Sequence, residues 1–203
     1  MKNVALLCVL FFFLALFPGQ YAYGQSFVKA EIYDELADLG RRLKLHSSEI
    51  DQLTATLHEA SFDPAFIKLF NEKPVRAMFV FSAAEGGVIF KFMSGKGMTA
   101  FADGRPKAPI WVDCRSVGAM IGGSHMLGVG LIMSASPDSE IGGTYEGNVG
   151  GATFATESTP TGAAFWKMGG FSGRDRPVVY LVYTARGVSL GAGNARLTLT
   201  TAW

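Results

Sequence analysis

The spacing of hydrophobic residues changes once along the chain, near Pro74. Before that point, apolar residues recur every three or four positions, which is the period of a helix that buries one face. The pattern predicts two amphipathic helices, built first on Ile32, Leu36, Leu39 and Leu43 and then on Ile50, Leu53 and Leu57.

Residues with strong capping preferences mark where two of these helices begin. We expect Ser48 to be the N-cap of the second helix. Asp63 and Pro64 predict a third, short helix, because the missing N–H of proline is not needed at the first helical position. Its expected buried side consists of Phe66, Ile67 and Phe70.

Beyond Pro74 the chain consists of short apolar runs such as VRAMFVFS, GVIFKFM and VVYLVYT, which predict roughly eight to ten strands. Glycines separate these runs, and 22 of the 25 glycines lie between residues 86 and 203. Glycine weakens a strand unless a bulge, a bend or a close backbone approach requires it. We therefore expect strong coiling of the sheet, with polar turns around residues 137–140 and 174–177.

These patterns together predict an α+β fold, in which N-terminal helices pack on a strongly coiled antiparallel β-sheet or a barrel-like sheet. We expect a single domain over residues 25–203. Its helical segment covers residues 25–73 and its glycine-rich β segment covers residues 74–203.

The first 24 residues have the composition of a secretory signal peptide. They contain Lys2, an apolar run over residues 4–17, and the small residues Ala22 and Gly24 before an expected cleavage at Gln25. An uncleaved anchor is the alternative, but the run is shorter than the roughly 20 residues of a membrane-spanning helix. We expect a periplasmic protein with no transmembrane span after cleavage. Its single remaining cysteine, Cys114, excludes an internal disulfide.

Charge and motifs argue against several classes of function. A net charge of +1 does not favour nucleic acid as a partner. The three histidines lack the spacing of a metal site, and neither SGKG at 94–97 nor GAGNAR at 191–196 completes a phosphate-binding fingerprint. Cys114 is expected to be a small buried side chain rather than a reactive thiol. We expect no catalytic activity, no metal and no cofactor.

Several glycine-containing motifs follow one another in order along the chain. VRAMFVFS at 75–82 is followed by EGGVIFKFMSGKGM at 85–98, KAPIWV at 107–112 and SVGAMIGG at 116–123, and then by YTARGVSLGAG at 183–193. In this order the motifs resemble the SYLF lipid-binding domain over nearly all of the mature chain. The chain departs from the family pattern where Trp111 follows Pro109 and where a late glycine is missing near Arg196.

The resemblance implies a non-enzymatic protein of the bacterial cell envelope that binds phospholipid, or an anionic membrane surface, through basic residues. Eukaryotic members of that family use an amphipathic N-terminal helix with basic residues, and Arg41, Arg42 and Lys44 end the first predicted helix here in a similar way. Each basic residue near an anionic membrane contributes about 1 kcal/mol, so these three alone would bind weakly. A second group, if its members share a face, consists of Lys91, Lys96, Arg105 and Lys107.

Other interpretations stay open at this point. The basic residues after Gly40 also suit the C-terminal end of a helix dipole, and acidic residues on the same helix oppose contact with anionic lipid. The alternation of Leu197, Leu199 and Trp203 is similar to the closing strand of a small outer-membrane β-barrel, although most predicted strands are shorter than such barrels require. A protein-interaction module of the envelope is a further alternative.

Overall fold

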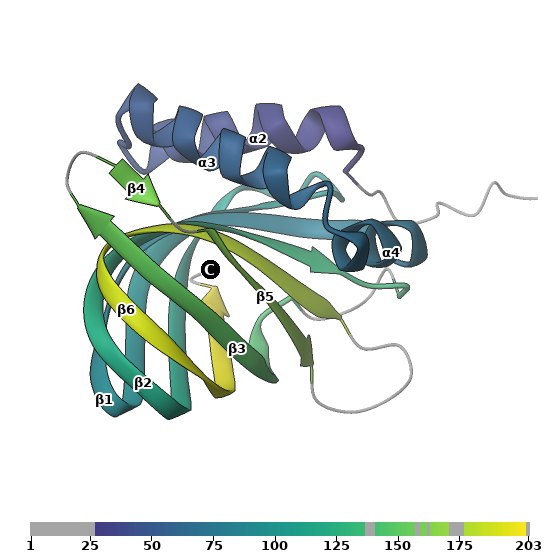
Figure 1. Ribbon diagram of the computed structural model, residues 1–203. Coiled ribbons are helices and arrows are strands. Elements are labelled where there is room, and N and C mark those ends of the chain that lie inside the picture. The colour runs from purple at the N-terminus through teal and green to yellow at the C-terminus, as the bar shows by residue number, and fades with distance from the viewer. Residues whose placement is uncertain (1–26, 137–140, 157–158, 162, 171–176, 202–203) are drawn as a thin grey trace, which may run out of the picture.

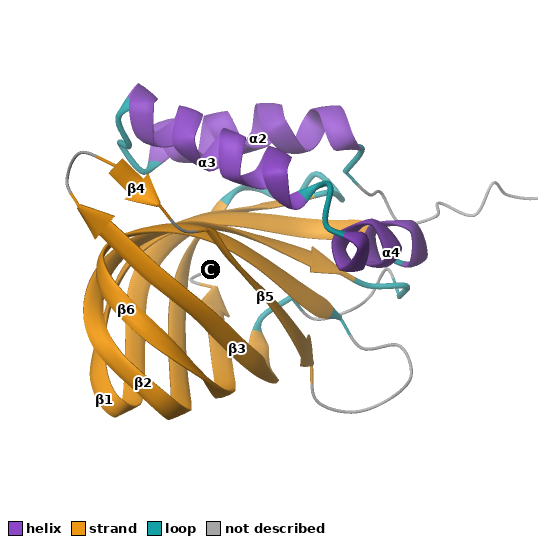
Figure 2. Ribbon diagram, viewed as in Figure 1, coloured by secondary structure: helices purple, strands orange, loops and turns teal. Residues whose placement is uncertain are grey.

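The computed structural model describes residues 27–136, 141–156, 159–161, 163–170 and 177–201. Within these residues, helices cover one side of a curled antiparallel sheet (Figures 1 and 2). The helices are α2 (Lys29–Arg42), α3 (Ser47–Ala60) and α4 (Pro64–Glu72). The strands are β1 (Val75–Phe101), β2 (Ala108–Met133), β3 (Gly143–Thr156), β4 (Thr159–Thr161), β5 (Ala163–Gly170) and β6 (Val178–Thr201). The predicted α+β arrangement is confirmed.

The predicted helices are present, and carboxylates satisfy backbone donors where they begin. The Val28 N–H donates to Glu31 Oε2 at 2.9 Å, and the His46 N–H donates to Glu49 Oε2 at 2.8 Å. His46 is therefore the residue that precedes α3, and the expectation that Ser48 caps this helix was wrong.

The third helix starts at the predicted proline. The Phe66 N–H donates to Asp63 Oδ1 at 3.3 Å, as expected for a helix that begins at Pro64. Phe66 is buried, but Ile67 is exposed and the prediction that it faces the core was wrong. Leu69 is buried instead, because residues three apart lie on the same helix face.

Three strands are much longer than the hydrophobic runs indicated. β1 has 27 residues, β2 has 26 and β6 has 24. Gly86 pairs with Gly123 and Gly87 pairs with Gly122, and the register shifts between Val88 and Phe90 just beyond them. The described residues form six strands, so the expectation of eight to ten was wrong. Glycine pairs here lie within continuous strands that curve, rather than between separate strands.

The curvature brings the two halves of β1 against each other. A Cβ on Gly95 would lie 2.3 Å from the carbonyl oxygen of Ser82, and a Cβ on Gly97 would lie 2.4 Å from that of Val80. The Thr99 hydroxyl donates to the Met78 carbonyl at 3.0 Å in the same region. These positions therefore require glycine for close backbone approach.

The order of strands in the sheet differs from their order in the chain. It is β1-β2-β6-β5-β3-β4, and β6 also pairs with β3. β6 pairs with β2 along its whole length on one side, while β5 and β3 pair with its first and last parts on the other. The C-terminal strand therefore lies inside the sheet.

Side chains of the sheet alternate between two hydrophobic clusters. On β1, Phe79 and Phe81 enter the cluster inside the curl, whereas Met78 and Val80 enter a second cluster with helix residues such as Leu36. The first half of β1 is therefore buried on both faces, which explains why VRAMFVFS is almost continuously apolar.

Two predictions of the sequence lie outside the described residues: the signal peptide over residues 1–24, and Trp203. The predicted polar turns at 137–140 and 174–176 do so as well. Among the described residues, no helix has both the length and the apolar character needed to cross a membrane.

Candidate functional site

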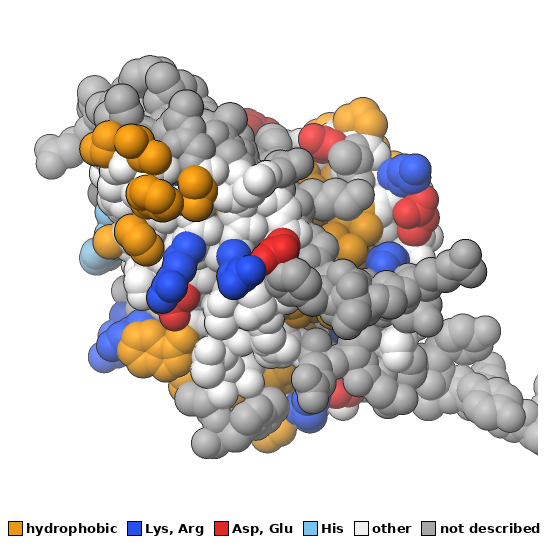
Figure 3. Space-filling view, turned by 90° about the horizontal axis from the view of Figure 1, so that it is seen from below, with side chains coloured by type: hydrophobic (Ala, Val, Ile, Leu, Met, Phe, Trp, Pro, Cys, Tyr) orange, Lys and Arg blue, Asp and Glu red, His pale blue; other side chains and the backbone are white. Residues whose placement is uncertain are grey.

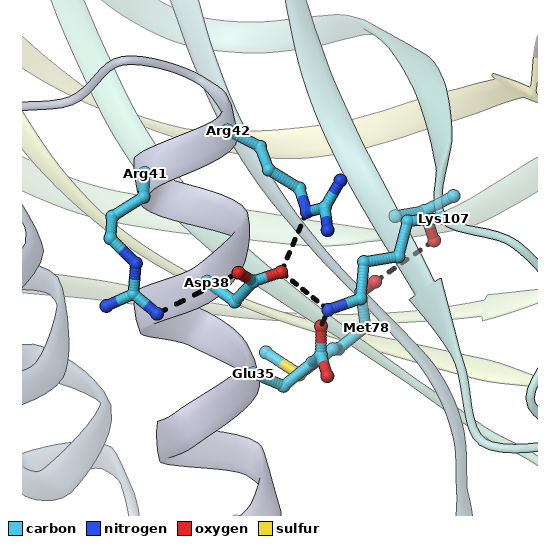
Figure 4. Close-up of polar contacts among 7 residues, drawn as sticks. Glu35, Asp38, Arg41, Arg42, Met78 and Lys107 are labelled. Carbon is cyan, nitrogen blue, oxygen red and sulfur yellow. Dashed lines mark hydrogen bonds and ion pairs between the residues drawn. The ribbon is translucent and has the colours of Figure 1, made fainter.

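Three of the predicted basic residues gather around two carboxylates at the end of α2 (Figure 4). Lys107, from the turn between β1 and β2, forms ion pairs with Glu35 and with Asp38, the latter at 2.6 Å. Arg42 Nε lies 2.8 Å and Arg41 3.8 Å from the Asp38 carboxylate. Hydrogen bonds from Lys107 first, and then from Arg42, lower the pKa of Asp38 to about 2. The positive charge of this group is therefore largely matched by acids of the same surface.

The other predicted basic residues do not join that group. Lys91 is buried and lies 2.7 Å from Glu85, which also accepts a hydrogen bond from the Ser124 hydroxyl at 2.8 Å. Arg105 pairs with Asp103 at 2.7 Å, and Lys44 is exposed just after α2. Lys96 lies over the Trp111 ring on another part of the sheet. The structure thus brings together Arg41, Arg42 and Lys107 but does not place all seven residues on one face.

A different surface of the sheet is left uncovered by the helices, and we call it the helix-free face. It is formed by outward side chains from the second half of β1, the start of β2, the end of β6 and the start of β3. Cross-strand pairing arranges them in rows, one of which runs from Phe92 through Arg115 and Arg196 to Glu146. The neighbouring rows contain Phe90, Val117 and Asn194 on one side and Ser94, Asp113, Thr198 and Thr144 on the other.

One end of this face carries a group of exposed hydrophobic side chains, which we call the apolar patch. Their exposed fractions are 64% for Val88, 59% for Ile89, 55% for Phe90, 57% for Phe92 and 52% for Val117. Phe90 pairs directly with Val117 across β1 and β2. Three consecutive exposed apolar residues are unusual on a water-exposed surface unless something binds there.

Charged side chains lie next to the apolar patch (Figure 3). Arg196 pairs with Glu146, with nitrogen–oxygen distances of 2.6 and 2.9 Å. Arg115 and Arg196 line two adjoining surface hollows of about 630 and 560 Å³. Phe92 lines one hollow and Val117 the other, so both hollows border the apolar patch.

Three kinds of catalytic group come into question among the described residues: a reactive thiol, a serine–histidine pair and a metal site. Burial, and secondarily the nearby charge of Glu85, raises the pKa of the Cys114 thiol to about 12, so the thiol stays protonated and unreactive. Ser82 Oγ lies 3.1 Å from His125 Nε2, but among the described residues no carboxylate forms a hydrogen bond or ion pair with His125 to orient it. No group of three or more potential metal ligands occurs in the described part of the chain.

The helix-free face was not predicted from the sequence, because the residues predicted to contact lipid were all basic. Phe90, Phe92, Ser94 and Lys96 alternate along one strand, as do Trp111, Asp113, Arg115 and Val117 along the next. This period of two predicts that each set shares a face. The alternation does not predict whether that face is exposed, because this depends on which side of the sheet the helices pack against.

In comparisons with known proteins, no family model, no curated protein and no solved structure matches this chain.

Proposed function

We propose that this protein binds phospholipid membranes peripherally, with the apolar patch entering the lipid interface and basic residues of the helix-free face contacting head groups. The observation that carries the proposal is the contiguous exposure of Val88, Ile89, Phe90, Phe92 and Val117 beside Arg115. A non-enzymatic role in the bacterial cell envelope is part of the proposal. It is supported by the signal-like N-terminal segment and by the resemblance of the motifs to the SYLF lipid-binding domain.

The size of the apolar patch sets the expected strength of binding. Complete burial of a large apolar side chain contributes about 1.5–3 kcal/mol, and these side chains are already about half buried, so each adds about 1 kcal/mol. Five such residues contribute about 5 kcal/mol, similar to the reversible anchoring by one acyl chain.

The charges of the helix-free face make a smaller contribution. Among its described residues, Lys96, Arg115 and Arg196 are basic, while Asp113 and Glu146 are acidic. One excess positive charge adds about 1 kcal/mol at an anionic surface. Binding should therefore be stronger to anionic vesicles but should persist in part on neutral ones.

The basic residues at the end of α2 should contribute less to membrane binding. Arg41, Arg42 and Lys107 already pair with Glu35 and Asp38, and contact with anionic lipid would have to compete with those pairs. Lys91 is buried against Glu85. Lys96 is the sequence-predicted residue that lies on the helix-free face itself.

Substitution of one aromatic residue of the apolar patch tests the proposal. Phe90→Ser should lower partitioning onto phosphatidylcholine–phosphatidylglycerol vesicles about fivefold, because it removes about 1 kcal/mol of apolar contact. The measurement is flotation of the purified protein with vesicles across a range of lipid concentrations.

Phe62→Ser is the matched control, because Phe62 is even more exposed than Phe90 but lies after α3 on the helix side of the sheet. Its partitioning should stay near that of the wild type. An equal loss in both variants, or a wild-type protein that does not float, contradicts the proposal. Capture of an envelope protein by the same patch, without vesicle binding, would favour the interaction-module alternative.

A further inference from the structure

Two arginines face each other across neighbouring strands in the middle of the helix-free face. Arg115 on β2 is the direct cross-strand partner of Arg196 on β6. Like charges at directly opposed positions destabilise a sheet, because their side chains lie close together on the same side.

The two arginines differ in how their charge is balanced. Arg196 forms a two-nitrogen contact with the Glu146 carboxylate. Arg115 has no ion pair or hydrogen-bond partner for its side chain among the described residues, and the nearby Asp113 accepts a hydrogen bond from the Ser94 hydroxyl at 2.6 Å. One guanidinium on this face is therefore available to an external anion.

The surroundings of Arg115 restrict the kind of anion. A guanidinium presents parallel N–H donors that match the oxygens of a phosphate group. Arg115 lines both surface hollows, and the hollows are bordered by Phe92 and Val117 of the apolar patch. A ligand seated there would place its anionic group on Arg115 and an apolar portion on the patch.

We infer that Arg115, with Arg196 beside it, binds the phosphate group of a phospholipid molecule whose acyl chains lie against the apolar patch. This inference rests on the proposed function and makes it more specific, since it assigns one residue to the head group. Free phosphate shares the same anionic chemistry but lacks the apolar portion. The patch therefore favours the lipid.

Three probes separate these sources: monomeric dihexanoyl-phosphatidylglycerol, inorganic phosphate, and phosphatidylglycerol vesicles. Calorimetric titration should show that the wild type binds the short-chain lipid more tightly than inorganic phosphate. Arg115→Gln should weaken binding of the short-chain lipid about tenfold, the effect expected when one charged hydrogen-bonding group is removed. Arg115→Lys should give an intermediate loss, because it keeps the charge without the planar pair of donors.

Lys68→Gln is the control with the same change of charge, on the exposed surface of α4. It should bind the short-chain lipid like the wild type. Thermal unfolding without ligand checks that Arg115→Gln is folded, and relief of the arginine–arginine repulsion should leave its stability equal to or above that of the wild type.

Each alternative result has a distinct meaning. Wild-type affinity in Arg115→Gln, or an equal loss in Lys68→Gln, overturns the inference even if vesicles still bind. Equal affinity for inorganic phosphate and short-chain lipid overturns the lipid assignment and leaves a free-phosphate site. If the wild type binds the short-chain lipid through Arg115 but does not bind vesicles, the inference stands and the proposed membrane binding fails.

Discussion

At the scale of single residues, Ile89 is held in a conformation that isoleucine rarely adopts. Its φ is 69°, in the left-handed region, and its side chain is exposed. This region costs an L-residue with a Cβ roughly 1–2 kcal/mol, and a branched Cβ makes the clash worse. The side chain is only about half buried, which offsets at most part of that cost, so stability alone does not explain an isoleucine at this position.

Ile89→Asn should stabilise the protein while weakening membrane binding. Asparagine tolerates the left-handed region, so the free energy of unfolding should rise by about 1 kcal/mol. Partitioning onto vesicles should fall, because one apolar contact is lost. Urea unfolding and vesicle flotation measure the two effects on the same preparation.

Val88→Asn provides the comparison, because Val88 is equally exposed but does not have a positive φ. It should lose membrane affinity without the gain in stability. A loss of stability in Ile89→Asn would indicate instead that the isoleucine side chain packs against the protein.

At the scale of elements, the long β1–β2 hairpin packs aromatic rings over glycines on the adjacent strand. Phe79 pairs with Gly130 and Phe81 pairs with Gly128, and each ring occupies the space that a side chain on its partner would need. Both phenylalanines are buried inside the curl. The glycines are therefore part of the core packing as well as of the curvature.

Gly130→Ala should destabilise the fold by about 1–3 kcal/mol, the usual effect of forcing an extra methyl group into a packed core. A Cβ at this position would lie 2.1 Å from Phe79 Cζ, so the ring would have to move. The midpoint of urea unfolding measures the change.

Gly86→Ala tests whether any added methyl group in a strand has this effect. A Cβ on Gly86 would meet no atom within 4 Å. Its midpoint should stay near the wild-type value, and an equal loss in both variants would argue against ring packing as the cause.

The sequence predicted the elements whose signals are local. The helices follow from apolar spacing and from Pro64, and the strands follow from β-branched runs. The strand count could not be derived, because Gly86 and Gly87 look alike whether they end a strand or bend it. The basic residues were visible in the sequence, but their partners were not, since Lys107 and Asp38 are 69 positions apart. The apolar patch was hidden for the same reason, because tertiary packing decides which face the helices cover.

At the scale of the whole molecule, the helical layer is tied to the sheet by both apolar packing and charge. Leu36 and Leu39 of α2 pack into the same cluster as Val80 and Val129 of the sheet. Lys107 connects the turn between β1 and β2 to α2 through Glu35 and Asp38. If the helix-free face binds a membrane, the helices point away from it into the aqueous phase (Figure 1).

The ion pair between Asp38 and Lys107 should weaken in acid. The pKa of Asp38 is lowered from 3.8 to about 2, so its ionised form is stabilised by folding. That stability is complete above pH 3.8 and is lost as the pH falls towards 2. Because the Asp38 carboxylate is about one third exposed, solvent screens its ion pairs, and we expect them to add about 1 kcal/mol to the free energy of unfolding.

Asp38→Asn isolates this contribution. The wild type should exceed the variant in unfolding free energy above pH 4 by about 1 kcal/mol, and the difference should shrink as the pH falls and vanish below pH 2. Urea unfolding at a series of pH values measures it. Lys107→Gln should reduce the same pH-dependent difference, whereas a difference that is constant with pH would mean that another group is responsible.

The position of β6 has a consequence for how the sheet assembles during synthesis. Residues 178–201 are synthesised after β1–β5, yet they fill the space between β2 on one side and β3 and β5 on the other. Until they arrive, β2 and β3 each present an unsatisfied row of backbone donors and acceptors, and such open rows recruit other chains. A nascent chain that has not yet incorporated β6 therefore exposes two open sheet edges, and the pairing of β6 closes both.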